Sequence, residues 1–151
     1  MKSKLLIRFA EETDVEDIVN LSALHAAYEK SDYNITGKVD RIAADFFGTN
    51  PPLFCLIAEV DQKPIGYATY MKQYATWDVE FYVYMDCLFV EEGYRGQGIG
   101  EKLVLKIKEE GLKLGCNLIQ WQTPDFNTRA IKFYNRIGAT SKSKERFFLD
   151  C

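Results

Sequence analysis

One stretch constrains this chain more than any other: an apolar segment runs into a glycine-rich turn that opens directly into an amphipathic helix. The apolar segment ends at Val90, and glycines stand at positions 93, 96, 98 and 100. Apolar residues from Ile99 onward recur on one face and predict a helix over residues 99–114. The first N–H groups of a helix lack intrahelical partners and carry the positive end of its dipole, so this turn favours an anion such as phosphate.

The residues of the turn strengthen this interpretation. Glycine has no Cβ, so Gly96, Gly98 and Gly100 let the backbone approach a ligand closely. Arg95 adds a permanent cation whose planar donors suit phosphate oxygens. The alternative is a turn that requires glycine only for its own tight shape. Neither a dinucleotide fingerprint nor a Walker loop fits, because Glu101 replaces the third glycine of the first and the Gly-Lys-Ser/Thr ending of the second is missing.

Length and composition limit the possible classes of protein. A chain of 151 residues suits one domain, residues 1–151, with a sizeable core. Its 19 Lys and Arg residues are outnumbered by 22 Asp and Glu residues, which argues against a nucleic-acid partner. No apolar run approaches the ~18 residues of a membrane span, so we expect no membrane partner and a cytoplasmic location. Four scattered cysteines and a single histidine, His25, predict reduced thiols and no metal site.

The remaining pattern predicts a mixed α/β (α+β) fold, with a mostly antiparallel sheet of about six to seven strands flanked by about four helices. Strands are expected over residues 4–10, 53–60, 65–71, 80–90 and 117–123, and helices over residues 13–28, 38–47, 99–114 and 127–137. The helix that follows Val90 predicts that the strands on either side of it are parallel. The aromatic tail over residues 140–149 should supply a last strand or hairpin, or pair across a homodimer.

Two motifs together resemble the signatures of the GNAT superfamily of N-acetyltransferases. Arg95, Gly98 and Gly100 match the Arg-x-x-Gly-x-Gly loop that binds the pyrophosphate of acyl-CoA in that family. Downstream, Asn127 is followed by Ala-x-x-Phe-Tyr-x-x-x-Gly, in which the tyrosine is Tyr134. With the order of elements, the resemblance covers nearly the whole chain. It implies a GNAT-like fold in which the parallel strand pair splays apart at the cofactor site.

The resemblance implies transfer of an acetyl group from acetyl-CoA to a primary amine, with Tyr134 as the general acid. It also implies a coenzyme site formed by the end of the strand, the glycine loop and the following helices. Its residues would be Leu88, Phe89, Val90, Arg95, Gly96, Gln97, Gly98, Ile99, Gly100, Asn127 and Tyr134. Two of these residues have structural alternatives: Asn127 as a helix N-cap and Tyr134 as a core tyrosine.

The base that deprotonates the amine is sought in the central strand. Strand alternation predicts one polar face and one apolar face, namely Tyr82, Tyr84 and Asp86 against Val83, Met85 and Cys87. The resemblance implies that Asp86 is the candidate base, because relatives that resemble the spermidine/spermine acetyltransferases carry acidic residues at this place. Aspartate is also unfavourable within an aromatic strand unless it has a partner, which supports a functional role. Glu80 is the reserve candidate, Asp86 could instead bond a neighbouring loop, and a route through water would need no single base.

Acidic and aromatic residues gather where the acceptor should enter. They are Tyr28, Glu29, Tyr33, Trp77, Glu80, Tyr82, Tyr84 and Asp86. Carboxylates and aromatic faces attract an ammonium group, which predicts a small cationic acceptor such as a polyamine, an amino acid or an aminoglycoside. The resemblance to polyamine and thialysine acetyltransferases is loose, because Cys87 stands where those proteins carry a second carboxylate. A protein amino terminus or lysine, and a non-catalytic CoA-binding domain, are the alternatives.

Overall fold

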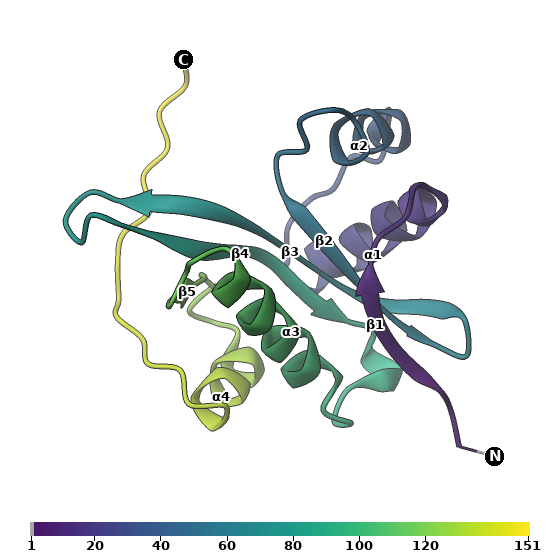
Figure 1. The fold of residues 1–151 in the computed structure, drawn as a ribbon. Coiled ribbons are helices and arrows are strands. Elements are labelled where there is room, and N and C mark those ends of the chain that lie inside the picture. The colour runs from purple at the N-terminus through teal and green to yellow at the C-terminus, as the bar shows by residue number, and fades with distance from the viewer. Residues whose placement is uncertain (1) are drawn as a thin grey trace.

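The computed structural model describes residues 2–151 and consists of a twisted mixed sheet with helices on both faces (Figure 1). Its elements are β1 (Leu5–Phe9), η1 (Glu12–Asp14), α1 (Val15–Tyr28), α2 (Lys38–Phe46), β2 (Phe54–Val60), β3 (Lys63–Ala75), β4 (Glu80–Val90), η2 (Glu92–Tyr94), α3 (Ile99–Lys113), β5 (Ile119–Gln120) and α4 (Thr128–Arg136). The strand order is β1-β2-β3-β4-β5. The first four strands are antiparallel neighbours, whereas β5 runs parallel to β4.

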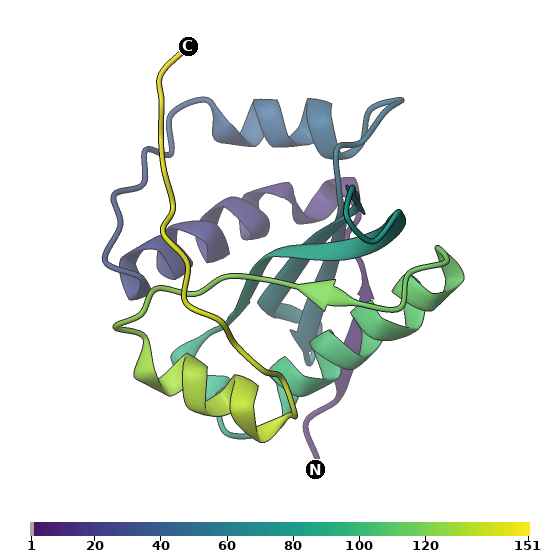
Figure 2. The same cartoon turned by 90° about the vertical axis from the view of Figure 1, so that its left-hand side faces the viewer.

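The predicted α/β class, the four α-helices and the parallel pair are confirmed within residues 2–151. The strand count is lower than predicted, because the sheet of the described residues has five strands. Residues 140–149 form neither the strand nor the hairpin that was expected, and the chain leaves α4 as an extended tail (Figure 2). The tail residues Phe147, Phe148 and Leu149 are exposed, since no neighbouring strand of the described chain pairs with them.

Two apolar layers hold the helices against the sheet. On one face, α3 contributes Leu103 and Ile107 to a cluster with Leu56 of β2, and all three are fully buried. On the other face, Ile18 of α1 packs with Ile57 of β2. Adjacent residues of β2 therefore face opposite layers, as strand alternation requires. Burial of each such side chain contributes ~1.5–3 kcal/mol, so the sheet is fixed firmly between the helices.

The central strand β4 contains a β-bulge at Asp86. Thr69 pairs with Cys87 and Tyr70 pairs with Met85, which leaves Asp86 without a partner in the ladder. A bulge inserts one residue and reverses the alternation beyond it. Met85 accordingly packs in the cluster under α3, whereas Cys87 packs against the cluster under α1. The prediction that Cys87 shares a face with Val83 and Met85 is therefore wrong.

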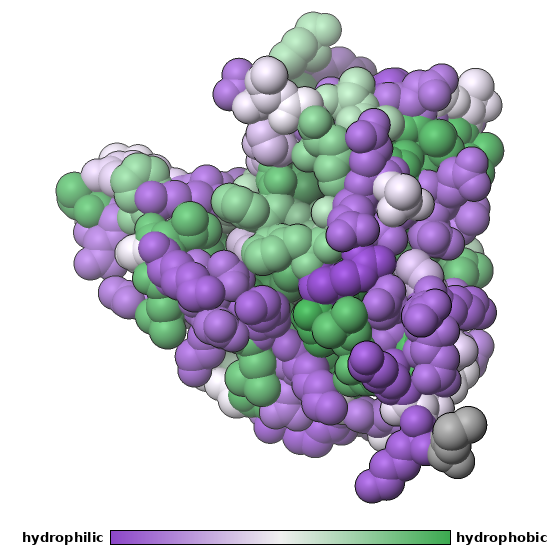
Figure 3. Space-filling view, turned by 45° about the vertical axis from the view of Figure 1, so that its right-hand side comes forward, coloured by the Kyte–Doolittle hydropathy of each residue, from purple (hydrophilic) through white to green (hydrophobic). Residues whose placement is uncertain are grey.

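The surface is mixed rather than uniformly polar. One face carries a central band of apolar residues bordered by polar ones (Figure 3). Partly exposed apolar side chains also occur on the first two strands, at Leu6, Phe9 and Phe54. Within residues 2–151, no helix combines the length and the apolar character needed to cross a membrane.

An ion-pair cluster fixes the start of α1 against β1. The Arg8 guanidinium donates to both carboxylate oxygens of Asp14, at 2.7 and 2.9 Å, and also to Glu59 at 3.1 Å. The Glu11 N–H donates to Asp14 Oδ2 at 2.7 Å. Asp14 is buried, and the hydrogen bonds from Arg8 hold the pKa of its carboxyl below the usual range.

We expect Asp14→Asn to lower stability at neutral pH and to flatten its dependence on acid. The folded-state pKa of Asp14 is depressed, so its contribution is present above the unfolded value near ~3.9 and is lost as the pH falls through the folded value. Urea denaturation should show a loss of ~1–3 kcal/mol at neutral pH that shrinks below about pH 4. Glu12→Gln, at an exposed carboxylate of η1, is the control. A constant difference at every pH would contradict the prediction.

Candidate active site

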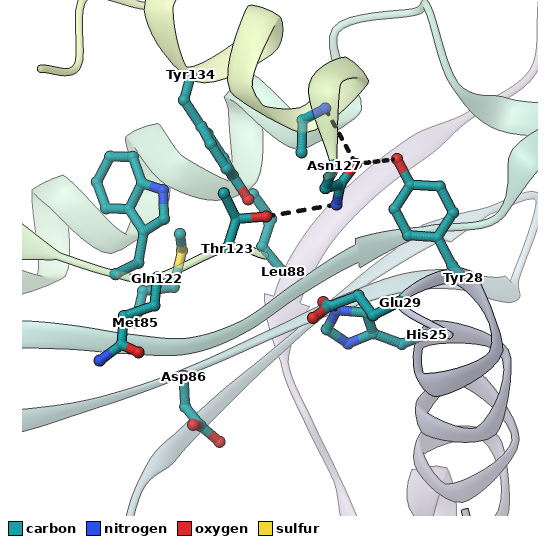
Figure 4. Close-up of a pocket in the computed structure, with 12 residues that line it drawn as sticks. His25, Tyr28, Glu29, Met85, Asp86, Leu88, Gln122, Thr123, Asn127 and Tyr134 are labelled. Carbon is teal, nitrogen blue, oxygen red and sulfur yellow. Dashed lines mark hydrogen bonds and ion pairs between the residues drawn. The ribbon is translucent and has the colours of Figure 1, made fainter. Parts of the chain in front are cut away.

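A small cavity of about 50 Å³ lies between β4, the segment after β5, and the ends of α1 and α4 (Figure 4). Its lining residues are His25, Tyr28, Glu29, Met85, Asp86, Leu88, Trp121, Gln122, Thr123, Asn127, Ala130 and Tyr134. The parallel ladder of β4 and β5 comprises only the pairs Val83–Ile119 and Tyr84–Gln120. Residues beyond this ladder on both strands line the cavity, which agrees with the splayed strand pair that the family resemblance implied.

Tyr134 reaches the cavity from α4. Its ring packs edge-on against Trp121, with ring centroids 5.1 Å apart, and its hydroxyl points toward Leu88 and Thr123 (Figure 4). Burial, and then the nearby Glu29 charge and Tyr28, raise the pKa of Tyr134 to about 12. The phenol therefore keeps its proton at neutral pH and can donate it, as a general acid must.

Two carboxylates line the cavity, Glu29 and Asp86, and Asp86 lies at the bulge of β4. Its side chain is exposed and points away from Tyr134 (Figure 4). The Cys87 Sγ lies 3.7 Å from Asp86 Oδ2. Burial, and then the Asp86 charge, raise the pKa of the Cys87 thiol to about 11. Cys87 is thus a neutral thiol at physiological pH rather than a reactive thiolate.

Asn127 ties three segments together at the edge of the cavity. Its Oδ1 accepts hydrogen bonds from the Tyr28 hydroxyl at 2.9 Å and from the Ala130 N–H at 3.4 Å. Its Nδ2 donates to Thr123 Oγ1 at 3.4 Å. The bond to Ala130 confirms that Asn127 is the N-cap of α4. A role for Asn127 in holding coenzyme stays a prediction.

The glycine loop has the shape that an anion cradle requires. Gly96 and Gly98 adopt left-handed conformations with φ of 79° and 78°, which residues with a Cβ rarely adopt. Both are exposed, and Gly98 is the N-cap of the 15-residue helix α3. A Cβ at Gly100 would lie 3.2 Å from the ring of Phe133, so this glycine lets α3 and α4 pack closely. The loop therefore offers open backbone at the helix terminus, and its role in binding the pyrophosphate of a coenzyme stays a prediction.

Arg95 has a different environment from the other loop residues. Its Nε donates to the Val90 carbonyl at 2.8 Å, which fastens the loop to the end of β4. Its guanidinium lies 4.3 Å from the ring centroid of Tyr28 and 5.2 Å from that of Phe89. Such cation–π contacts are worth ~0.5–2 kcal/mol. Arg95 thus connects the loop with α1 across the end of the sheet.

The predicted acceptor residues fall into two groups. Tyr28, Glu29 and Asp86 line the cavity, whereas five do not: Tyr33, Trp77, Glu80, Tyr82 and Tyr84. Trp77 is 98% exposed in the β3–β4 connection. The Tyr82 hydroxyl donates to Gln73, at 2.8 Å. The Lys38 ammonium lies 3.5 Å from the ring centroid of Tyr33. The structure therefore brings together only part of the predicted acceptor site.

Several lining residues were missed by the sequence prediction, and His25 is the most informative. Its Nε2 lies 2.5 Å from Glu29 Oε2, and its Nδ1 lies 2.8 Å from the Tyr67 hydroxyl. The sequence contains a signal for this pair, because residues four apart on a helix share a face. Among residues 2–151, no group of three or more His, Cys, Asp or Glu side chains is arranged to hold a metal ion.

Comparison with known proteins agrees with these features. The model of the acetyltransferase (GNAT) family matches residues 15–139. Thialysine N-epsilon-acetyltransferase of Mus musculus is 33% identical, over 95% of this chain and 88% of its own length. Spermidine/spermine N(1)-acetyltransferase-like protein 1 of Homo sapiens is 32% identical, over 92% of this chain but 21% of its own length.

A similar fold is also known among solved structures. An aminoglycoside N-acetyltransferase in complex with CoA superimposes with a TM-score of 0.83. The match covers 99% of this chain and 97% of that chain, at 20% identity. At this level of identity the likeness concerns the arrangement of the backbone. The likeness shows that the mixed sheet and its flanking helices form an architecture that is already known from a solved structure.

We expect Tyr28→Phe to weaken the connection between α1 and α4. The substitution removes the hydroxyl that donates to Asn127 but keeps the ring that stacks against Arg95. The free energy of unfolding, measured by urea denaturation, should fall by about 1 kcal/mol. Tyr74→Phe is the matched control, because Tyr74 is 50% exposed and packs edge-on against Phe81. Equal stabilities of the two variants would contradict the prediction.

Proposed function

The chain belongs to the GNAT family of acetyltransferases, and from this premise we propose that it acetylates a primary amine of a small cationic molecule, such as a polyamine, an amino acid or an aminoglycoside. Family membership makes it an acetyl-CoA-dependent N-acetyltransferase. One observation carries the proposal on the acceptor. Tyr134, which keeps its proton, shares a small cavity with two carboxylates, Glu29 and Asp86.

The proposed coenzyme site comprises the end of β4, the glycine loop and the start of α4. Acetyl-CoA supplies the acetyl group as a thioester. The exposed backbone of Gly96, Gly98 and the first turn of α3 would hold the diphosphate. Leu88, Phe89, Val90, Arg95, Gln97, Ile99, Gly100, Asn127 and Tyr134 complete the proposed set. The packing of Arg95 on Tyr28 supports a role in shaping the loop as well as in attracting phosphate.

The proposed chemistry is a direct transfer to the amine. An amine is protonated at neutral pH, so a base must first remove its proton. We assign this step to Asp86, with Glu80 or water as the alternatives. The amine nitrogen then forms a bond to the carbonyl carbon, the carbon–sulfur bond breaks, and the leaving sulfur receives the proton of Tyr134. The new amide nitrogen gives its remaining extra proton to the Tyr134 phenolate, and Asp86 releases the first proton to solvent, so that both groups are restored. A backbone N–H near Leu88 would stabilise the negative charge on the carbonyl oxygen, an effect worth ~10²–10³ in rate.

The names of the relatives favour a small amine over a protein substrate. The Mus musculus protein is named for the ε-amine of thialysine, and this chain covers most of its length. The acceptor residues that line the cavity, Tyr28, Glu29 and Asp86, combine an aromatic ring with two carboxylates. This combination suits an ammonium group.

Three further expectations remain proposals. The exposed tail residues Phe147, Phe148 and Leu149 support a homodimer, because an apolar extended segment gains stability from a partner strand. Sedimentation of the full chain would test the dimer. The cytoplasmic location, and the absence of nucleic-acid and membrane partners, stay predictions from the sequence.

Acetylation of a panel of amines tests the proposed function. Thiol release from acetyl-CoA and mass spectrometry of the products should identify a small cationic amine as the best acceptor. The panel includes thialysine, lysine, ornithine, spermidine, spermine, an aminoglycoside and a peptide with a free amino terminus. Turnover of the peptide alone would favour a protein acetyltransferase. No turnover, together with CoA binding, would favour a non-catalytic domain.

We expect Tyr134→Phe to lower kcat by roughly 10-fold to 10⁴-fold, because the variant lacks the proton donor. The affinity for CoA, measured by calorimetry, should change little. Since the pKa of Tyr134 is about 12, wild-type kcat should show no loss from ionisation of this residue in the neutral range. Tyr74→Phe again serves as the control. An unchanged kcat for Tyr134→Phe would remove this residue from the mechanism.

A further inference from the structure

His25 connects the cavity with the buried face of the sheet. It is the single histidine of the sequence and stands four residues before Glu29 on α1. Its side chain is only 14% exposed, and its ring stacks on Phe89 with centroids 5.3 Å apart and planes 14° apart. Both ring nitrogens have polar neighbours, Glu29 at Nε2 and Tyr67 at Nδ1. The ring is therefore held in one orientation from three sides.

The partners of the ring select one tautomer. Tyr67 is 2% exposed on β3, and its burial raises the pKa of the phenol far above its ordinary value, so the hydroxyl keeps its proton. An ionised carboxylate can only accept hydrogen bonds. All these groups are satisfied when Tyr67 donates to Nδ1 and Nε2–H donates to Glu29.

This arrangement determines the direction of the Glu29 carboxylate. The side chain of Glu29 is 30% exposed, so without a partner it could turn into solvent. Held by His25, it points into the cavity below the Tyr134 hydroxyl (Figure 4). The charge of Glu29 also contributes to the raised pKa of Tyr134, which indicates that the carboxylate and the phenol are close.

We propose that His25 is a positioning residue of the acceptor site: locked by Tyr67 as the Nε2–H tautomer, it holds the Glu29 carboxylate in the cavity as the counter-ion of the acceptor's cation. The inference rests on the proposed function, because it takes Glu29 as a group that binds the acceptor. It assigns no proton transfer to His25. The histidine acts through Glu29 alone.

The tautomer can be tested without any substrate. Because the chain has a single histidine, long-range ¹H–¹⁵N spectra of the labelled protein contain one imidazole, which requires no assignment by mutation. Slightly above neutral pH we expect a protonated Nε2 and an unprotonated Nδ1. Tyr67→Phe removes the donor to Nδ1. Combined with Glu29→Gln, which replaces the carboxylate that can only accept at Nε2, it should produce a mixture of both neutral tautomers. A proton on Nδ1 in the wild-type chain, alone or together with one on Nε2, would overturn the proposal.

The role of His25 can be tested by a double-mutant cycle. His25→Leu should raise KM for 1,3-diaminopropane roughly tenfold and leave kcat within about twofold, as expected for loss of a charge-assisted hydrogen bond that orients a binding group. His25→Gln keeps an N–H donor and should recover much of the loss. Combined with Glu29→Gln, the His25→Leu change should have no further effect, because its influence passes through Glu29.

The control for the cycle is Leu24→Gln, since Leu24 is 49% exposed on the same helix and lies outside the cavity lining. Additive effects of His25→Leu and Glu29→Gln, or a fall in kcat with unchanged KM, would contradict the proposed role of His25. Either result would leave the proposed function intact. If 1,3-diaminopropane is not acetylated, the best acceptor of the amine panel replaces it. A chain that acetylates no amine would remove both the proposed function and the acceptor role of His25.

Discussion

The short parallel ladder between β4 and β5 is the constraint on which the rest of the site depends. Only two residue pairs join the strands, and the chain then leaves the sheet. The end of β4 therefore lacks a neighbouring strand on that side, and backbone that is not paired must be satisfied by another group. The cavity and the N-terminus of α4 adjoin this gap. A longer ladder would close the space in which Tyr134 lies.

The bulge at Asp86 is a second feature of β4 on which the site depends, and a regular ladder would not produce its effect. It reverses the alternation of β4, so that Met85 packs under α3 while Cys87 and Phe89 pack under α1. The same reversal leaves Asp86 exposed beside the cavity instead of in either apolar layer. A charged residue thus occupies the middle of a buried strand without the large penalty of burial.

Much of the fold and part of the candidate site could be predicted from the local chemistry of the sequence. The glycine-rich turn before α3 was visible in the sequence, and the motif from Asn127 to Tyr134 placed a cap and a cavity tyrosine on one short helix. Features that depend on register or on distant contacts were not visible. Simple alternation misplaced Cys87, because a bulge leaves no composition signal in β4. His25 was set aside as a lone histidine, since its partner Tyr67 lies 42 positions away.

The hydrogen bond between Tyr28 and Asn127 spans 99 positions of sequence and joins the first helix to the last. The free-energy cost of closing a loop of n residues grows only as ~(3/2)RT ln n. The chain must nevertheless bear this cost before the contact can stabilise it. During synthesis, the walls of the cavity cannot meet until the chain as far as Tyr134 has left the ribosome. Emerging chains consequently lack an assembled cavity, because its first and last lining residues lie far apart in the order of synthesis.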